Sequence, residues 1–197
     1  MPDLWADSLE AHRDLVRQRL LTAFAELAAE VPLDDVTLTA VAERAGLARS
    51  AVYNYVTSKH DLLLAHTADV TSRWVERLVR DGGATVAERL GRFVAATLRV
   101  FAEDRLAGQG ADIPFDAEQH ARLMAALRPV HDHLSALVAE GVADGSFTGD
   151  PAELTRFVFA TLEGYRTSIA RGEVDAEVAA STITDLLLDG LHGRRDG

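Results

Sequence analysis

The residues with the clearest capacity for chemistry lie in one short window, residues 44–60. This window carries three cations, Arg44, Arg49 and Lys59, and no acidic side chain, whereas the whole chain has a formal net charge of −11. Such an acidic protein is unsuited to binding nucleic acid over its whole surface. One local positive window therefore predicts contact with an anionic backbone at a single place, although a short window of this kind also arises without any function.

Other groupings of reactive side chains do not form a catalytic or metal site. His131 and His133 point about 200° from each other on a helix, so they cannot share a metal ion. His120 and His131 share a helical face but lack a metal-ligand spacing. Gly108 and Gly110 lack the third glycine and the preceding strand of a dinucleotide loop, and the chain has no Gly-x-Ser-x-Gly and no cysteine. We therefore predict no catalytic residue, no metal and no cofactor.

The sequence predicts a protein that is helical almost throughout. Alanine, leucine, arginine and glutamate dominate, only five prolines interrupt, and no apolar alternation of strand length occurs. The predicted helices cover residues 8–30, 38–45, 49–56, 59–80, 85–104, 116–143, 151–171 and 175–192, with a helical turn within 107–114. We predict an all-α fold of about nine helices, in which a small N-terminal three-helix unit joins a larger bundle.

Local signals place several helix ends. Pro32 stops the first helix, Gly46 ends the second, and Ser58 with Asp61 fits a capping box. Pro151 suits a first helical turn, where its missing N–H costs nothing. In the helix expected at 85–104, the apolar spacing turns six side chains inward: Leu90, Phe93, Val94, Thr97, Leu98 and Phe101.

The two short helices around Gly46, following a longer one, have the layout of a helix-turn-helix. The second would turn Val52 and Val56 inward. Its outward or rim positions would be Arg49, Ser50, Tyr53, Asn54 and Tyr55. The same pattern fits an ordinary corner of a helical bundle equally well.

The stretch from Thr37 to Leu63 resembles the signature of the TetR family of transcriptional regulators. The positions in register are Thr37, Val41-Ala42, Ala45-Gly46-Leu47, Tyr53, Ser58-Lys59 and Asp61-Leu62-Leu63, together with Arg17 and Leu20-Leu21 in the first helix. Residues 140–147 and 187–191 also resemble stretches common in the family. The sequence departs from the pattern at Ala48, which replaces the usual Ser, Thr or Pro cap, at Pro32 and at Val56. The missing cap should cost the helix predicted at 49–56 about 1 kcal/mol of stability.

The resemblance implies a DNA-binding regulator, with residues 1–58 as the DNA-binding domain and 59–197 as a bundle for ligand binding and dimerisation. Thr37 and Thr39 would hold a phosphate, and Asn54 would read adenine through its amide. The remaining implied DNA-contacting residues are Arg49, Ser50, Ala51, Tyr53, Tyr55 and Lys59. The implied function is that of a repressor released from operator DNA by a small-molecule effector.

For the bundle, the resemblance implies an effector site and a homodimer formed by the last two helices. Candidates for the effector site combine apolar surface with a polar or aromatic group: Trp74, Phe93, Thr97, Phe101, Met124, His131, Glu163 and Tyr165. Candidates for the dimer interface are Phe157, Thr161, Gly164, Ile183 and Leu187. For each effector-site candidate a plain core position is the more common explanation, whereas the dimer candidates rest on the last two helices having more apolar surface than one intramolecular face needs.

Two further expectations concern location and the competing functions. The N-terminus lacks the pattern of a signal peptide, and no apolar stretch approaches the ~18 residues of a membrane-spanning helix. We therefore expect a cytoplasmic protein with no membrane partner. An all-α enzyme and a helical protein-interaction module remain as alternatives to the regulator.

Overall fold

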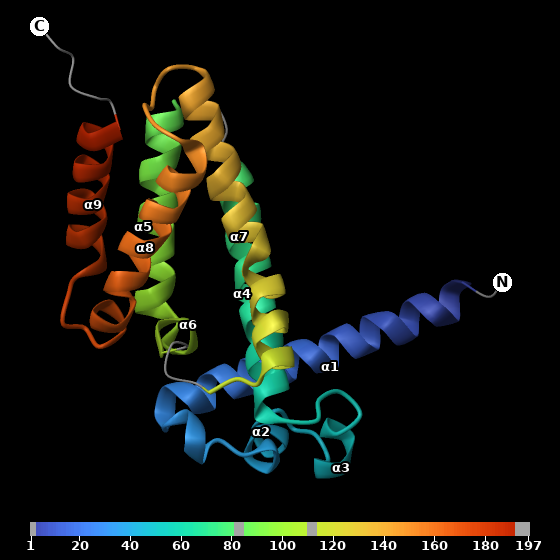
Figure 1. Ribbon diagram of the computed structural model, residues 1–197. Coiled ribbons are helices and arrows are strands. Elements are labelled where there is room, and N and C mark those ends of the chain that lie inside the picture. The colour runs from blue at the N-terminus through green and yellow to red at the C-terminus, as the bar shows by residue number, and fades with distance from the viewer. Residues whose placement is uncertain (1–2, 81–84, 110–113, 192–197) are drawn as a thin grey trace, which may run out of the picture. The chain divides into compact units, whose positions relative to one another are not determined.

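The computed structural model describes residues 3–80, 85–109 and 114–191. Within these ranges the chain forms nine α-helices, one short 3-10 helix and no strand, which confirms the predicted all-α class (Figure 1). The chain divides into two compact units, residues 1–67 and 68–197. This division lies inside a helix, several residues beyond the predicted boundary between 58 and 59.

The first unit contains the helix-turn-helix. Its elements are α1 (Asp3–Glu30), the 3-10 helix η1 (Leu33–Asp35), α2 (Leu38–Arg44), α3 (Arg49–Val52) and the first turns of α4 (Lys59–Arg80). Five side chains with less than 2% exposure form the centre of its core: Leu20, Phe24, Val41, Val52 and Leu62. The ring of Phe24 also meets that of His66 edge to face, at 6.4 Å between centroids, so the start of α4 packs within this unit.

The caps and turn of α2 follow from its sequence. The Thr37 hydroxyl oxygen accepts a hydrogen bond from the Ala40 N–H at 3.2 Å, as expected of an N-cap threonine. At the other end, Leu47 N donates to Ala42 O and Gly46 N to Glu43 O, which is the Schellman arrangement. Gly46 has φ +67°, a backbone conformation that residues other than glycine rarely adopt. The tight turn of the motif is thus built by one glycine.

Helix α3 is shorter than predicted, because it ends at Val52 rather than Val56. Ala48 at its N-cap supplies no side-chain hydrogen bond, so the helix begins without the usual support. After Val52 the chain tightens into turns: Asn54 N donates to Ala51 O at 3.1 Å and Tyr55 N to Val52 O at 2.9 Å. Tyr53 and Asn54 therefore lie in a turn that extends the short helix.

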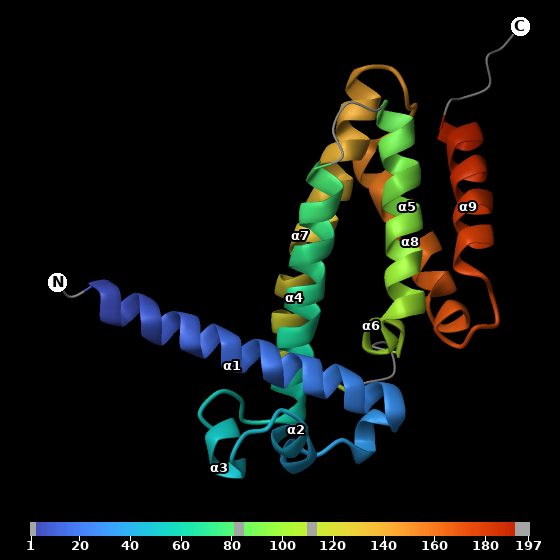
Figure 2. The ribbon, with the colours of Figure 1, turned by 180° about the vertical axis from the view of Figure 1, so that it is seen from behind.

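The second unit is a bundle around α5 (Val86–Glu103). The other members are the rest of α4, α6 (Arg105–Gln109), α7 (Ala117–Ala143), α8 (Pro151–Ala170) and α9 (Ala176–Leu191). Helix α5 packs against α7, α8 and α9 (Figure 2). The six side chains of α5 predicted to face inward are all buried. The sequence therefore anticipated the central helix of this core correctly.

Short-range capping signals set the beginnings of these helices. Thr85 and Glu88 form a complete capping box at α5, and Asp116 with Gln119 forms another at α7. Ser58 and Asp61 exchange hydrogen bonds at 3.1 Å in both directions, as predicted for α4. The segment 81–83, predicted to close α4, lies outside the described residues.

Helix α7 ends against its own following turn. The Phe147 N–H donates to the Gly141 carbonyl at 2.7 Å, and the buried ring of Phe147 lies directly over Gly141. A Cβ at position 141 would collide with that ring. The absence of a side chain there is what allows the turn to fold back on the helix.

Candidate nucleic-acid interface and ligand site

In the first unit, several polar side chains of the helix-turn-helix are exposed, and the segment that carries them is held in place by one buried residue. Arg49, Ser50 and Asn54 are exposed, and Tyr53 is 52% exposed. Val52 has 0% exposure. The segment 49–54 therefore docks through Val52 and presents a cation, a hydroxyl, a phenol and an amide to solvent, which are groups that bind phosphate and base edges.

The remaining predicted contacts are partly covered. Thr37 is exposed, and its oxygen is engaged as the α2 cap, which leaves the hydroxyl proton for a phosphate. Thr39, Ala51 and Tyr55 are half-buried. They lie at the edges of the exposed segment rather than at its centre.

Two of the three cations of the basic window are engaged within the first unit. The Arg44 guanidinium binds Glu30 through two hydrogen bonds, at 2.9 and 2.8 Å, and lies 3.6 Å from Glu26. These contacts join α2 to α1. The hydrogen bond from Arg44 lowers the pKa of Glu30, and the same contact raises the pKa of Arg44.

Lys59 is held in a similar way. Its ammonium donates to the carbonyls of Leu33 and Asp34, both at 3.1 Å, and to the Asp34 carboxylate at 3.4 Å. Since an ammonium has three donors, a phosphate at Lys59 must compete with these acceptors. Arg49 has no such partner among the described residues, so it is the cation of the window that stands available.

In the second unit, aromatic rings and histidines from four helices form a cluster. Trp74 of α4 meets Phe93 of α5 at 5.1 Å between ring centroids, and Phe93 meets His133 of α7 at 6.1 Å. Phe159 of α8 joins Phe93 at 6.3 Å and stacks on His131 at 5.3 Å. The structure therefore brings together Trp74, Phe93 and His131, three of the predicted site residues.

The cluster contains a buried donor without an acceptor. Trp74 is 5% exposed, and its indole Nε1 has no hydrogen-bond partner among the described residues. Buried N–H groups are nearly always hydrogen-bonded in folded proteins. A bound molecule that offers an acceptor would satisfy this one.

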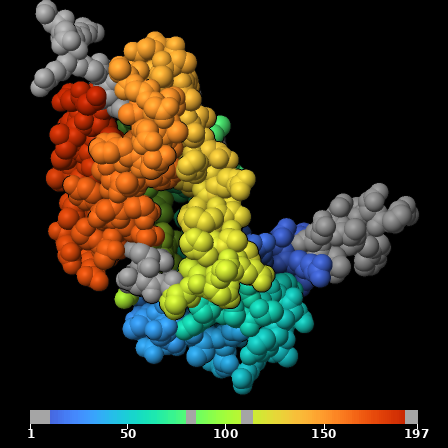
Figure 3. Space-filling model, viewed as in Figure 1, coloured from blue at the N-terminus to red at the C-terminus, as the bar shows by residue number. Residues whose placement is uncertain are grey.

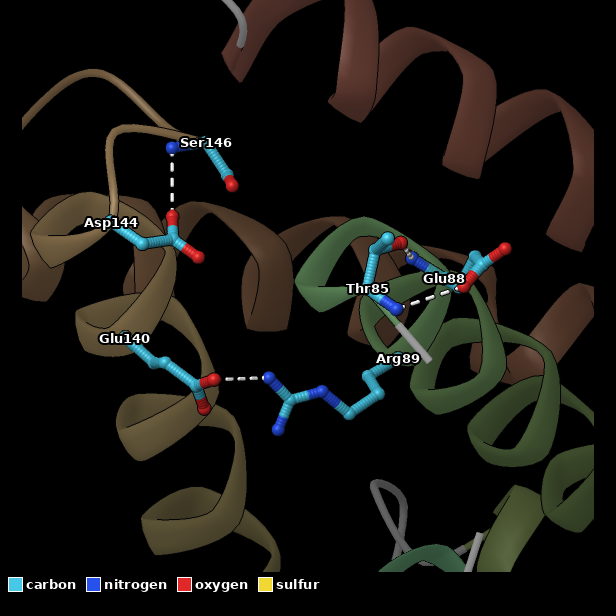
Figure 4. Close-up of polar contacts among 6 residues, drawn as sticks. All are labelled: Thr85, Glu88, Arg89, Glu140, Asp144 and Ser146. Atoms are coloured by element: carbon cyan, nitrogen blue, oxygen red, sulfur yellow. Dashed lines mark hydrogen bonds and ion pairs between the residues drawn. The ribbon is translucent and has the colours of Figure 1, made fainter. Parts of the chain in front are cut away.

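The aromatic cluster carries little net charge, because His133 favours its neutral form and the charge of the nearby Arg89 is paired. Burial, and secondly the nearby Arg89, lower the pKa of His133, which favours its neutral form. Arg89 itself forms an ion pair with Glu140 of α7, and the Ser146 N–H donates to Asp144 at 2.8 Å (Figure 4). The Arg89 charge is thus matched by a carboxylate outside the aromatic cluster.

The other predicted ligand residues are either buried or partly buried in the core, or exposed on the surface. The Thr97 hydroxyl donates to Phe93 O at 2.8 Å. Phe101 is buried, and Tyr165 is partly buried against the same core. Glu163 is exposed and pairs with Arg166 at 2.9 Å, and Met124 is 46% exposed. Sequence reasoning missed Phe159, and it weighed His133 only as a metal ligand, which it rejected, because no local spacing links residues on different helices.

The predicted dimer residues divide between surface and core. Phe157 is 62% exposed, and a Cβ at Gly164 would meet nothing within 4 Å. Thr161 is half-buried. Ile183 and Leu187, however, are 2% and 4% exposed in the core of the single chain, so their prediction as interface residues is corrected: they face α5. The exposed apolar side chains of α9 are Val178, at 66%, and Leu186, at 69%.

Comparison with known proteins decides the family. Residues 20–66 match the family described as bacterial regulatory proteins, tetR family, and residues 83–191 match the tetracyclin repressor-like C-terminal domain. The chain belongs to the TetR family. It is a DNA-binding transcriptional regulator, and the helix-turn-helix is its DNA-binding motif rather than a bundle corner.

Among similar proteins, the TetR-family chain is 21% identical to the fatty acid metabolism regulator protein of Bacillus subtilis, over 89% of this chain and 95% of that one. The crystal structure of Bacillus subtilis FadR in complex with stearoyl-CoA matches with a TM-score of 0.78 and 20% identity, covering 89% and 99% of the two chains. A TetR/AcrR-family regulator from Thermobifida fusca matches with a TM-score of 0.69 and 27% identity, covering 91% and 98%. About nine tenths of the regulator thus shares the fold of these proteins.

The described part of the TetR-family chain offers neither a metal site nor a membrane span. Within its ranges, no three His, Asp or Glu side chains are gathered so that they could hold a metal ion. Nor do those ranges contain a helix long and apolar enough to cross a membrane.

Proposed function

We propose that this TetR-family regulator is a repressor that binds operator DNA through residues 37–59 and is released by a small molecule bound in its second unit. The observation that supports the DNA-binding half most directly is the exposed segment 49–54 on its buried Val52 anchor. The proposed DNA contacts are Thr37, Thr39, Arg49, Ser50, Ala51, Tyr53, Asn54, Tyr55 and Lys59. Such a regulator acts where the DNA is, in the cytoplasm.

Within this set, Asn54 and Arg49 are assigned different roles. The Asn54 amide is exposed in the turn that follows the short helix and matches the N6/N7 edge of adenine. Arg49 is exposed and unpaired within the described chain, which suits a phosphate or a guanine edge. Base contacts discriminate sequences, whereas phosphate contacts add affinity that depends on salt.

Substitution at these two positions should separate the roles. The probe is a duplex selected by the full chain from a random library. Asn54→Ala should relax the selected sequence, with a loss of about 1–3 kcal/mol at one base pair and little change in salt dependence. Arg49→Gln should make the log–log slope of affinity against salt shallower by about 1 for each phosphate that the variant no longer neutralises. Arg77→Gln, an exposed arginine of α4 in the second unit, is the matched control.

Two results would contradict these assignments. If Asn54→Ala selects the same sequence with the same affinity, asparagine is not the base reader. If neither variant differs from Arg77→Gln, the exposed segment 49–54 does not contact DNA.

For the effector, we propose an amphipathic molecule with a long apolar part and a hydrogen-bond acceptor that reaches Trp74 Nε1. The apolar cluster of Trp74, Phe93 and Phe159 and the unpaired indole N–H support this chemistry. The similar Bacillus subtilis regulator has been crystallised with stearoyl-CoA, so a long-chain acyl thioester is the first ligand to test. Its thioester oxygen would supply the acceptor.

Stearoyl-CoA should therefore raise the melting temperature of the full chain and weaken its binding to the selected duplex. Release requires the ligand to prefer the conformation that does not fit DNA. Trp74→Phe keeps an aromatic ring and removes the N–H. It should lower the affinity for the ligand about tenfold, the cost of one neutral hydrogen bond, and it should leave the affinity for the duplex unchanged. A ligand that raises the melting temperature without changing DNA affinity would argue against the release mechanism.

A homodimer completes the proposal. Operator binding by a helix-turn-helix dimer requires two recognition helices about 34–36 Å apart, in successive major grooves. Exposed Phe157, Val178 and Leu186 on α8 and α9 supply apolar surface for the contact. Figure 3 shows the atoms of these two helices, orange and red, forming one continuous surface.

A further inference from the structure

The charge available to DNA in the first unit comes mostly from outside the helix-turn-helix. Residues 1–67 contain six arginine and lysine side chains, three of them on α1: Arg13, Arg17 and Arg19. Arg44 and Lys59 are bound by carboxylates of the same unit. The α1 arginines are exposed, and within the described residues they have no ion-pair partner. The basic window of the sequence therefore keeps one available cation, Arg49, while α1 carries three.

Two of these arginines lie on the face of α1 that packs against the motif. The buried side of α1 runs through Val16, Leu20 and Phe24, with 5%, 1% and 0% exposure, and α1 contacts α2. Arg13 stands seven residues before Leu20, and Arg17 stands seven residues before Phe24. Because seven residues make nearly two full helical turns, both arginines project to the same side as this buried stripe.

Toward the N-terminus from Val16, no core covers the described side chains of this face. Residues 11–15 are all exposed, and Leu15 is 59% exposed. Figures 1 and 2 both show the N-terminal half of α1 running out past α3. Asp14 lies about 100° around the helix from Arg13 and about 60° from Arg17, and among the described residues it forms no ion pair with either arginine. This face of α1 thus carries two exposed cations, Arg17 next to Val16 and Arg13 one turn nearer the N-terminus, which together form a cationic strip.

We propose that this strip is a second DNA contact, in which Arg13 and Arg17 bind phosphates of the duplex that flank the segment read by α3. The proposal rests on the DNA-binding function proposed above. Guanidinium groups bind phosphate oxygens through paired hydrogen bonds, and each phosphate neutralised contributes about 0.9 to the salt slope for B-DNA. The strip carries no sequence information, so its role is to raise affinity and lengthen the footprint.

The test compares two double variants of the full chain on the selected duplex, which is extended by flanking DNA on both sides. Arg13→Gln/Arg17→Gln removes the strip and keeps good helix formers at both positions. Arg73→Gln/Arg77→Gln removes two exposed arginines with the same spacing from α4. The first variant should make the salt slope shallower by about 1.8 per protomer, shorten the hydroxyl-radical footprint at its outer edges and leave the selected sequence unchanged. The control variant should match the unmodified protein.

The possible failures are distinguishable. If Arg13→Gln/Arg17→Gln has the slope and footprint of the control while Arg49→Gln weakens binding, the strip is not a DNA contact and the proposed function stands. If the unmodified chain selects no duplex at all, the proposed function fails and this inference with it. Circular dichroism of the double variant should show unchanged helicity; an equal reduction of affinity at all salt concentrations would assign the arginines to folding instead.

Discussion

Replacing Val52 with aspartate is expected to abolish operator binding and to lower the melting temperature of the first unit. Val52 is fully buried and is the anchor of α3, a helix of four residues without a side-chain cap. An aspartate there would place an unpaired carboxylate in the core, a change that typically costs more than about 3 kcal/mol. The measurements are thermal melting by circular dichroism and binding to the selected duplex by fluorescence anisotropy.

Tyr53→Asp is the matched control, because it introduces the same charge at the next position, which is 52% exposed. It should weaken DNA binding through charge repulsion and leave the melting curve in place. If Val52→Asp melted like the unmodified protein and still bound the duplex, α3 would not dock through Val52, and the arrangement of the motif described above would be wrong.

Phe157→Asp combined with Leu186→Asp is expected to convert a dimer into a monomer. Light scattering at micromolar concentration should give a mass near twice 21.3 kDa for the unmodified protein and near 21.3 kDa for the variant. The physical reason is that both side chains are largely exposed in the single chain, so a charge there costs little in the monomer and much in an apolar interface. The affinity of the double variant for operator DNA should also fall, since the two recognition helices are no longer linked.

Val79→Asp serves as the control, because Val79 is 65% exposed but lies on α4. A double variant that remains dimeric would place the interface elsewhere. An unmodified protein that is only monomeric would remove the homodimer altogether.

The features of the fold that could be predicted from the sequence are those set by neighbouring residues. Gly46 and the pair Ser58 and Asp61 act on the backbone within a few positions, so their types alone predicted the turn and the start of α4 correctly. The inward face of α5 was equally accessible, because a spacing of three and four residues is a property of one helix.

The features that escaped prediction depend on residues brought together by folding. The basic window was interpreted as a phosphate-binding patch, but Glu30 and Asp34 engage Arg44 and Lys59 from 14 and 25 positions away. The early end of α3 also had no local signal, because the uncapped Ala48 weakens the start of the helix but does not place its end at Val52.

The orientation of the last helix was another such feature. In the sequence of α9, Val178, Ile183, Leu186 and Leu187 are spread over more than one side of a helix, and periodicity alone cannot say which side faces α5. Ile183 and Leu187 turned out to lie in the core, and Val178 and Leu186 outside it. A helix that is apolar on both sides needs its neighbour's position before its faces can be assigned.

The contact between Gly141 and Phe147 has an evolutionary consequence. Because the phenyl ring occupies the volume that a Cβ at position 141 would fill, neither position can change freely while the other is kept. A side chain at 141 requires a smaller residue at 147, and removal of the ring at 147 opens space that favours a side chain at 141. The two positions should therefore co-vary among relatives that keep this turn, with glycine retained wherever the aromatic ring is retained.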